Sequence, residues 1–143
     1  MTDDSNSEGI IKNETGAQRC LGYILDVGQS DRRARCSLTI TDDHLNRHDS
    51  LHGGIVSAVL DNAMGATASL TVDDTGKTPF MTISLNTQFI APAKKGETIT
   101  AVGRVVGGGL SIKFLEGELV NSKGKLIASA TGVFKGVGGG RSK

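Results

Sequence analysis

The chain has 143 residues, a formal net charge of +1, 37% hydrophobic residues and 3% aromatic residues. This length is enough for one domain that buries its own core. Balanced charge and few aromatic side chains argue against a nucleic-acid surface, and the short apolar runs argue against a transmembrane helix and a signal peptide. We therefore expect a cytoplasmic protein without nucleic-acid or membrane partners.

The two cysteines, Cys20 and Cys36, are too few for a disulfide framework. Their spacing also differs from the short spacing of metal-binding pairs. We therefore expect two reduced, semi-buried thiols.

The first part of the chain contains two predicted strands. Residues 1–15 show no apolar period apart from Ile10–Ile11, so we expect a mobile arm there, with ordered structure beginning near Arg19. Residues 21–27 form a short run with β-branched residues, bounded by a polar turn, which indicates a strand. Residues 33–40 alternate between apolar and polar side chains, as in an antiparallel strand with one solvated face.

A slim apolar helix is predicted over residues 54–70, and it carries a single acid, Asp61. Small side chains surround this acid, so neighbouring backbone can approach the helix closely. Gly53 and Gly54 fall in the first turn, where free N–H groups and the helix dipole stabilise a developing negative charge. A carboxylate in such a segment is costly without a partner or a use, which favours an active site. The alternative to a catalytic Asp61 is a structural acid held by hydrogen bonds. The alternative for Gly53 and Gly54 is that they serve only close packing.

All three histidines lie in or beside the polar segment before the helix, at His44, His48 and His52. On a continuous helix their spacing of four residues would place them on one face, as in a zinc site. The turn-forming residues between them argue against such a helix. We favour solvated loop positions for His44 and His48, an active-site or helix-capping position for His52, and no metal or other cofactor.

Four strands follow the helix, over residues 80–91, 98–106, 110–121 and 126–135. Glycine-containing turns join the last three as hairpins, which predicts an antiparallel sheet. One helix cannot cover both faces of a sheet of about six strands, so we expect a second copy to cover apolar surface or an edge strand. The domain is expected over residues 16–136, followed by a flexible glycine-rich tail at 137–143.

Within residues 80–91 the side chains alternate. Met81, Leu85 and Phe89 fall on one face of this predicted strand, and Thr82 falls on the other. Simple alternation therefore separates Thr82 from the apolar face of its strand.

Three groups of residues resemble one family. They are Asn46-x5-His52-Gly53-Gly54-x6-Asp61, then Phe89-x2-Pro92-Ala93-x2-Gly96, and Gly124-Lys125-Leu126-Ile127-Ala128-x-Ala130-Thr131-Gly132. The pattern resembles the hotdog-fold acyl-CoA thioesterases of the phenylacetate-degradation (PaaI-like) type, over residues 17–136. The resemblance implies an α+β fold in which a curved antiparallel sheet wraps a long central helix. It also implies hydrolysis of an acyl-CoA thioester to free acid and CoA, by a homodimer at least and usually by a homotetramer built as a dimer of dimers.

The resemblance assigns roles to five residues. Asp61 matches the family's catalytic carboxylate, as general base or nucleophile, and Gly53 matches the glycine whose N–H polarises the thioester carbonyl. Asn46 and His52 match residues that position the water, the thioester or the loop. Thr82 falls where the family places a hydroxyl that assists the water, although a threonine on a strand needs no special explanation.

The sites for the acyl group and for CoA are less clearly marked. Candidates for lining the acyl pocket are Gly54, Met64, Phe80 and Met81, although Met and Phe at such positions also suit an ordinary core. Relatives often carry a basic residue on the first hairpin for the CoA phosphates, whereas residues 107–110 contain none. The remaining candidates for the phosphates are Lys94, Lys95, Arg104 and Lys113.

Two other functions stay open on this fold. One is a regulatory module that binds acyl-CoA without catalysis, for which the N-terminal arm is too short to supply an effector segment. The other is an acyl-thioester dehydratase, because His52 and Asp61 supply the residue types for proton transfer across an alkene. The two glycines beside His52 and the presence of Asn46 favour hydrolysis.

Overall fold

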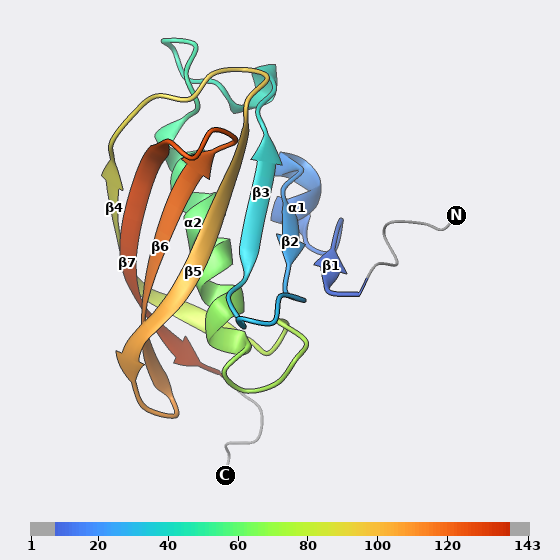
Figure 1. Ribbon diagram of the computed structural model, residues 1–143, viewed down its shortest axis with the longest axis vertical. Coiled ribbons are helices and arrows are strands. Elements are labelled where there is room, and N and C mark those ends of the chain that lie inside the picture. The colour runs from blue at the N-terminus through green and yellow to red at the C-terminus, as the bar shows by residue number, and fades with distance from the viewer. Residues whose placement is uncertain (1–7, 138–143) are drawn as a thin grey trace.

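The computed structural model describes residues 8–137, in which a curved antiparallel sheet packs around one long helix (Figure 1). The long helix is α2 (Gly53–Ser69), and a short helix, α1 (Gly16–Leu21), lies near the N-terminus. The strands are β1 (Ile10–Ile11), β2 (Ile24–Asp26), β3 (Arg35–Thr39), β4 (Phe80–Phe89), β5 (Thr98–Gly108), β6 (Ile112–Asn121) and β7 (Leu126–Gly136). They pair in the order β1-β2-β3-β5-β6-β7-β4, with every neighbouring pair antiparallel. The α+β hotdog architecture is confirmed, with seven strands in place of about six.

The sheet can enclose α2 because the two surfaces lack bulk where they meet. A Cβ atom on Gly103 of β5 would lie 2.4 Å from the hydroxyl oxygen of Thr67 on the helix. On Gly117 of β6, it would lie 3.0 Å from the sulfur of Met64. Glycine at these two positions therefore lets helix and sheet approach closely, and the core forms between them.

Residues 8–15, which the sequence predicts to belong to a mobile arm over residues 1–15, are part of the fold. Residues 1–7 lie outside the described part of the chain. Ile10–Ile11 pairs with β2, and the side-chain oxygen of Thr15 caps the start of α1. The helix ends at Gly22, which has a left-handed φ of 87°, so the strand predicted from residue 21 begins only at Ile24. The prediction fails here because caps and turns, not apolar periodicity, organise this segment.

The strands after α2 follow the prediction closely. The β5–β6 turn is closed by the N–H of Gly109, which donates to the carbonyl of Ile112, and β5 runs two residues further than expected. The β6–β7 turn is closed between Asn121 and Lys125. Of the predicted tail, Val137 is described and its N–H donates to the carbonyl of Pro79, whereas residues 138–143 lie outside the described range.

A bulge in β4 changes which of its side chains face α2. The pairing of β4 with β7 shifts register between Thr82 and Ser84. Thr82 therefore faces the helix on the same side as Leu85, while Met81 points away and is 53% exposed. Simple alternation therefore places Thr82 on the wrong face. One extra residue in a strand moves the side chains on one side of the bulge to the opposite face of the sheet.

The two thiols have opposite environments, so the prediction of two semi-buried cysteines is wrong for both. Cys20 on α1 is exposed, whereas Cys36 on β3 is completely buried. Burial raises the pKa of the Cys36 thiol far above its ordinary value, because the thiolate cannot be solvated there.

Helix α2 has 17 residues and is enclosed by the sheet along one side. Among the helices of residues 8–137, none has the length and hydropathy that a membrane span requires. The cytoplasmic location stays a prediction.

Candidate active site

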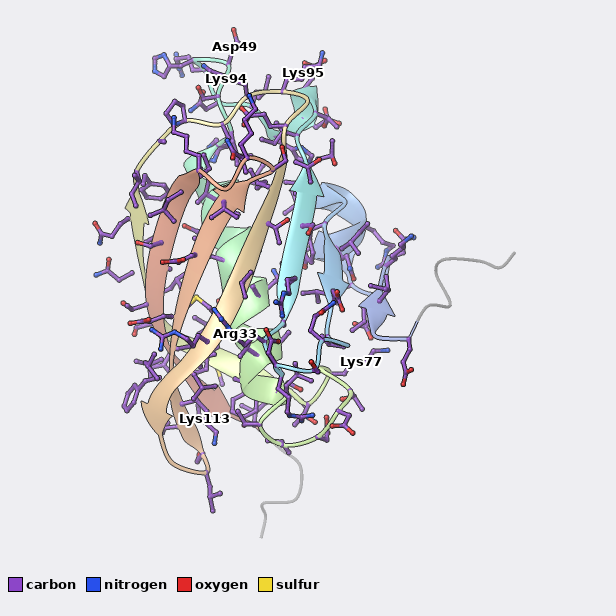
Figure 2. The ribbon with its side chains drawn as sticks, in the orientation of Figure 1. Arg33, Asp49, Lys77, Lys94, Lys95 and Lys113 are labelled. Atoms are coloured by element: carbon purple, nitrogen blue, oxygen red, sulfur yellow. The ribbon has the colours of Figure 1, made fainter. Side chains whose placement is uncertain are left out.

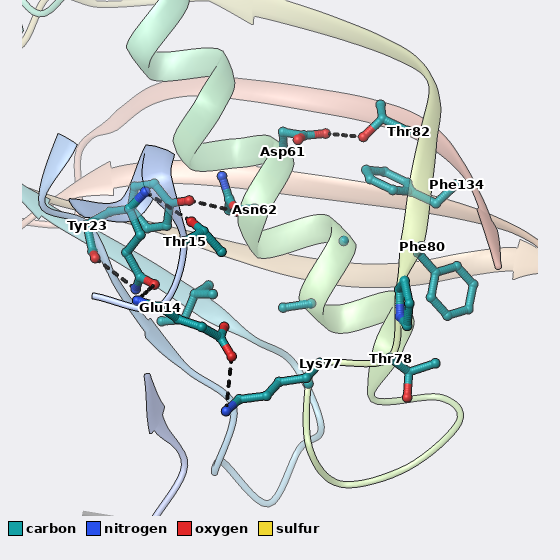
Figure 3. Close-up of a pocket in the computed structure, with 16 residues that line it drawn as sticks. Glu14, Thr15, Tyr23, Asp61, Asn62, Lys77, Thr78, Phe80, Thr82 and Phe134 are labelled. Atoms are coloured by element: carbon teal, nitrogen blue, oxygen red, sulfur yellow. Dashed lines mark hydrogen bonds and ion pairs between the residues drawn. The ribbon is translucent and has the colours of Figure 1, made fainter. Parts of the chain in front are cut away.

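Asp61 lies midway along α2 and points toward β4 (Figure 3). The hydroxyl of Thr82 donates a hydrogen bond of 2.7 Å to Asp61 Oδ1. Within residues 8–137 this hydroxyl is the one protein donor to the carboxylate, and no cation pairs with it. Because Asp61 is only partly buried, its free lone pairs remain available to a water molecule or a substrate.

Asp61 and Thr82 line a hollow of about 440 Å³, which we call the Asp61 hollow. Its walls come from five parts of the chain: residues 14–25, α2, the loop before β4, β4 and β7. Besides the site pair, the hydrogen-bonding side chains that line it include Glu14, Thr15, Gln18, Tyr23, Asn62 and Lys77. The hollow therefore places an available carboxylate beside a largely polar surface.

The start of α2 supplies a free backbone donor. The ring Nδ1 of His52 caps the helix by accepting the N–H of Gly54 at 2.9 Å, which confirms the capping position. The N–H of Gly53 has no acceptor within the described residues, as expected for the first residue of a helix. A donor at this end of the helix dipole suits a developing oxyanion.

A second hollow, of about 450 Å³, opens beside this helix start, and we call it the Gly53 hollow. Most of its lining is apolar and includes Leu51, Val56, Phe89, Ile90 and Ile127. Asn46, also in the lining, uses its side-chain oxygen to accept the N–H groups of His48 (2.8 Å) and Ser50 (3.1 Å). The side-chain nitrogen of Asn46 donates to no acceptor among residues 8–137, so it can donate to a ligand.

The two hollows have no lining residue in common. Gly53 and Asp61 are eight residues apart on one helix, which separates them by about 12 Å along its axis. The structure thus brings Asp61 together with Thr82, and Gly53 together with Asn46. It does not bring these two pairs together within one chain, and a single thioester group cannot contact both.

The four candidates for the acyl pocket are distributed differently from the prediction. Phe80 lines the Asp61 hollow. Met64 is completely buried in the core, and Met81 is exposed on the far side of β4. Gly54 lies beside the ring of His52, where a Cβ would approach ring atoms to 3.1 Å. Met64, Met81 and Gly54 line neither hollow in the single chain.

The histidines do not form a metal site in the described residues. His44 ends the short 3₁₀ helix η2 (Asp42–His44) and is buried, contrary to the predicted solvated position. Its Nδ1 accepts the N–H of Thr41 at 2.9 Å, and its Nε2 lies 2.8 Å from the carbonyl oxygen of Leu21. His48 is exposed, as predicted. Within residues 8–137, no three His, Cys, Asp or Glu side chains are grouped closely enough to hold a metal.

Among the basic candidates for the CoA phosphates, Lys94 is hydrogen-bonded to a residue that lines the Gly53 hollow. Its ammonium donates to the hydroxyl of Ser50 at 2.9 Å, and Ser50 lines the Gly53 hollow. Figure 2 shows Lys94 and Lys95 at the same end of the molecule and Lys113 at the opposite end. Lys95 pairs with Asp42 at 3.0 Å.

Arg104 is the remaining basic candidate for the phosphates. It forms an ion pair with Glu116 across the β5–β6 hairpin. The Gly53 hollow therefore has Lys94 at its rim, whereas Arg104 is already partnered away from both hollows.

Two residues of the Asp61 hollow, Tyr23 and Asn62, are not predicted as site residues from the sequence. The hydroxyl of Tyr23 donates to Asn62 Oδ1 at 3.1 Å, across 39 positions of the chain. Asn62 in turn donates to the carbonyl of Ala58 at 2.8 Å. The available signals were that Tyr23 is the single tyrosine and that Asn62 follows Asp61 on an apolar helix. Neither signal reveals that the N-terminal segment packs against α2.

Comparison with known proteins identifies the family. The chain matches the family model of the thioesterase superfamily over residues 48–128. It is 32% identical to acyl-coenzyme A thioesterase 13 of Homo sapiens over 123 residues, which cover 83% of this chain and 86% of that protein. Its fold matches that of the Escherichia coli PaaI protein from the phenylacetic acid degradation operon, with a TM-score of 0.74 and 26% identity, over 88% of this chain and 87% of that one.

AziG of S. sahachiroi has a similar structure, with a TM-score of 0.74, 25% identity, and coverage of 86% of this chain and 97% of that chain. The matched family region contains both the start of α2 and Asp61. Sequence, fold and family model therefore agree. The chain belongs to the thioesterase superfamily, as a PaaI-like thioesterase with the hotdog fold.

Proposed function

We propose that this thioesterase hydrolyses acyl-CoA, with Asp61 activating the water and the N–H of Gly53 binding the thioester oxygen. The observation that carries the proposal is the Asp61–Thr82 pair in an open hollow, on the same helix whose first N–H is free. The acyl-CoA substrate class is supported by relatives named acyl-coenzyme A thioesterase, at 32% and 25% identity.

In the proposed reaction, the Asp61 carboxylate takes a proton from water as the water oxygen attacks the thioester carbon. The carbonyl oxygen becomes an oxyanion, which the N–H of Gly53 stabilises by a hydrogen bond at the positive end of the helix dipole. The tetrahedral intermediate collapses by breaking the carbon–sulfur bond. The leaving CoA thiolate receives the proton from Asp61, so the products are the free acid and CoA.

Thr82 acts as a positioning residue in this scheme. Its hydrogen bond fixes one carboxylate oxygen and leaves the other facing the hollow. The alternative role of Asp61 is direct attack on the thioester, which would form a mixed anhydride. A single turnover with excess enzyme in H₂¹⁸O separates the two roles. General-base catalysis places the label in the released acid, whereas the anhydride pathway, opened at its aspartyl carbonyl, places it in Asp61.

The complete site is formed by two chains in this proposal. The separation of about 12 Å between Gly53 and Asp61 rules out a shared thioester within one helix. If two α2 helices lie antiparallel about a two-fold axis, the Gly53 hollow of one protomer faces the Asp61 hollow of its partner. Two equivalent sites then result, each with Asn46 and Gly53 from one protomer and Asp61 and Thr82 from the other.

The free edge of β4 supports the same homodimer. β4 ends the sheet, and its other edge pairs with no strand among the described residues. The neighbouring apolar side chains Ile83, Phe89 and Ile90 are more than half exposed there. A long exposed edge with apolar side chains favours pairing with a second sheet. We extend the proposal to a homotetramer, formed as a dimer of such dimers.

A thiol-release assay with a panel of aromatic, short, medium and long acyl-CoAs tests the proposal. We expect CoA release from at least one class without added metal or cofactor. The same preparation is offered enoyl-CoA, and hydration without thiol release would assign the site to a dehydratase. Acyl-CoA binding in calorimetry, with neither reaction, would assign the protein to the regulatory class.

A further inference from the structure

The β5–β6 hairpin projects beyond the end of α2, at the lower end of the molecule in Figure 1. Leu110 lies at its tip and is 95% exposed. The turn is closed by the bond from Gly109, and the N–H of Gly136 on β7 donates to the carbonyl of Ser111 at 2.8 Å. These bonds hold the tip to the sheet, so a large apolar side chain is kept in solvent at a defined place.

Apolar side chains lie on both faces of this hairpin. Val105 pairs with Leu115, which is buried against the core, so Val105 lies on the same face and points to the helix side. It is nevertheless 38% exposed, which means that α2 does not cover it. Ile112 and Phe114 alternate with the helix side and are exposed on the outer face of the sheet. With Leu110 at the tip, apolar surface therefore surrounds the hairpin and does not form one flat face.

The charged side chains on the strand ends at this part of the molecule are all positive. Residues 80–84, 105–115 and 131–137 contain two lysines, Lys113 and Lys135, and no acidic residue. Lys113 is visible at the lower end in Figure 2, and Lys135 pairs with β4 on one side and β6 on the other. Within residues 8–137 neither lysine forms an ion pair. The balanced charge of the whole chain therefore does not describe this end.

Acidic residues that border these strand ends have partners of their own. Glu116, the first acid after the hairpin, pairs with Arg104. In the loop before β4, Asp74 pairs with Arg32, and Asp73 accepts hydrogen bonds from two threonines of the same loop. The two lysines are thus the charges at this end that remain available to an outside partner.

We infer that this end of the molecule docks on an anionic lipid membrane. We call it the hairpin surface, and it consists of Val105, Val106, Leu110, Ile112, Lys113, Phe114 and Lys135. Apolar side chains that surround a tip can enter the boundary between headgroups and acyl chains together, whereas the flat surface of a protein contacts one face of a hairpin. The lysines behind the tip then meet the anionic headgroups, because their long stems let the ammonium groups reach the polar layer.

Co-sedimentation with lipid vesicles tests the inference. It uses no substrate, so its result is independent of the proposed hydrolysis. We expect the protein to bind vesicles of phosphatidylglycerol and phosphatidylcholine, and to bind phosphatidylcholine alone more weakly. Leu110→Ser removes the apolar tip and should lower the affinity for the mixed vesicles about tenfold. Lys135→Gln should lower that affinity about fivefold and leave binding to neutral vesicles unchanged, because it removes one charge near the lipid surface.

Ile24→Ser is the matched control, because it removes a partly exposed apolar side chain from β2, outside the hairpin surface. It should bind vesicles as the wild type does, and circular dichroism with thermal unfolding verifies the fold of each variant. Equal affinity for anionic and neutral vesicles, or an equal loss in Ile24→Ser and Leu110→Ser, would overturn the inference. Failure of the wild type to bind, with Leu110→Ser changing the molar mass in light scattering, would instead assign the hairpin to a contact between copies.

Discussion

The Asp61 hollow and the Gly53 hollow are nearly equal in volume, at about 440 and 450 Å³, but differ in chemistry and in origin. The Gly53 hollow is mostly apolar and is built from two short stretches, residues 46–56 and 89–93, with one residue from β7. The Asp61 hollow is largely polar and takes its lining from residues 14–25, α2, residues 76–82 and β7.

This contrast indicates that two positions on α2 supply different chemical groups. One end of α2 supplies a backbone donor, and its middle supplies a carboxylate. Each of these two groups therefore has its own hollow, and neither hollow contains both of the groups that the proposed hydrolysis uses. Four predictions test this division, from the largest expected effect on activity to the smallest.

Asp61→Asn should remove the base from the Asp61 hollow while keeping its shape. Asparagine has the same size as aspartate, but its amide cannot accept a proton from water. We expect kcat for acyl-CoA hydrolysis to fall about 10²- to 10⁴-fold, with little change in thermal stability. Asp43→Asn, which neutralises an exposed acid outside both hollows, is the control. Turnover close to wild type in Asp61→Asn would refute the assigned role.

Thr82→Val should loosen the same carboxylate without removing it. The variant keeps the shape of threonine but cannot donate to Asp61 Oδ1. Loss of this orienting bond should lower kcat about tenfold, with KM nearly unchanged. Thr87→Val is the matched control, because Thr87 lies on the same strand and accepts a bond from Ser57 of α2. Equal effects of the two variants would mean that Thr82 supports only the packing of β4.

Mixing two inactive variants should rebuild one site of the dimer. Asn46→Ala damages the Gly53 hollow and Asp61→Asn the Asp61 hollow, so a mixed dimer has one undamaged site of its two. Random pairing makes about half of the dimers mixed, so up to about a quarter of wild-type activity should return after joint unfolding and refolding. The measurement requires that Asn46→Ala alone is nearly inactive. Mixed dimers seen by mass spectrometry, but without activity above either parent, would locate the site within one chain.

Chelation should have no effect on activity, because the proposed chemistry uses a carboxylate and a backbone donor in the two hollows and no metal. We expect equal thiol release before and after treatment with a chelator. Loss of activity that added zinc restores would contradict this expectation. His48, in the lining of the Gly53 hollow, would then be the first ligand to examine.

The two hollows also differ in how far they are predictable from sequence. Asn46, His52 and Gly53 lie close together in the chain, so their spacing predicts the cap, the free N–H and the adjacent loop. The hydrogen bonds of Asn46 and His52 confirm that local arrangement. Phe89, from the second group of matching residues, packs against Gly53, where an added Cβ would lie 3.3 Å from its ring.

The Asp61 hollow is predictable only in part. The isolated acid on an apolar helix marks Asp61, but the position of Thr82 depends on the β4 bulge, which alternation does not reveal. The N-terminal wall depends on Gln18, whose three hydrogen bonds reach carbonyls and an N–H outside its own helix. A prediction based on apolar periodicity treats such a segment as unstructured.

The sequence by itself determined the long helix, its capped start, the antiparallel strands after it and the acid at its centre. These features follow from local hydrogen bonding and from the periods of helix and strand, which nearby residues specify. Only the tertiary structure decided that Thr82 faces Asp61, that Tyr23 meets Asn62, and that the donor and the carboxylate occupy separate hollows. Those outcomes depend on contacts between segments far apart in the chain, and no local pattern encodes which of them pack together.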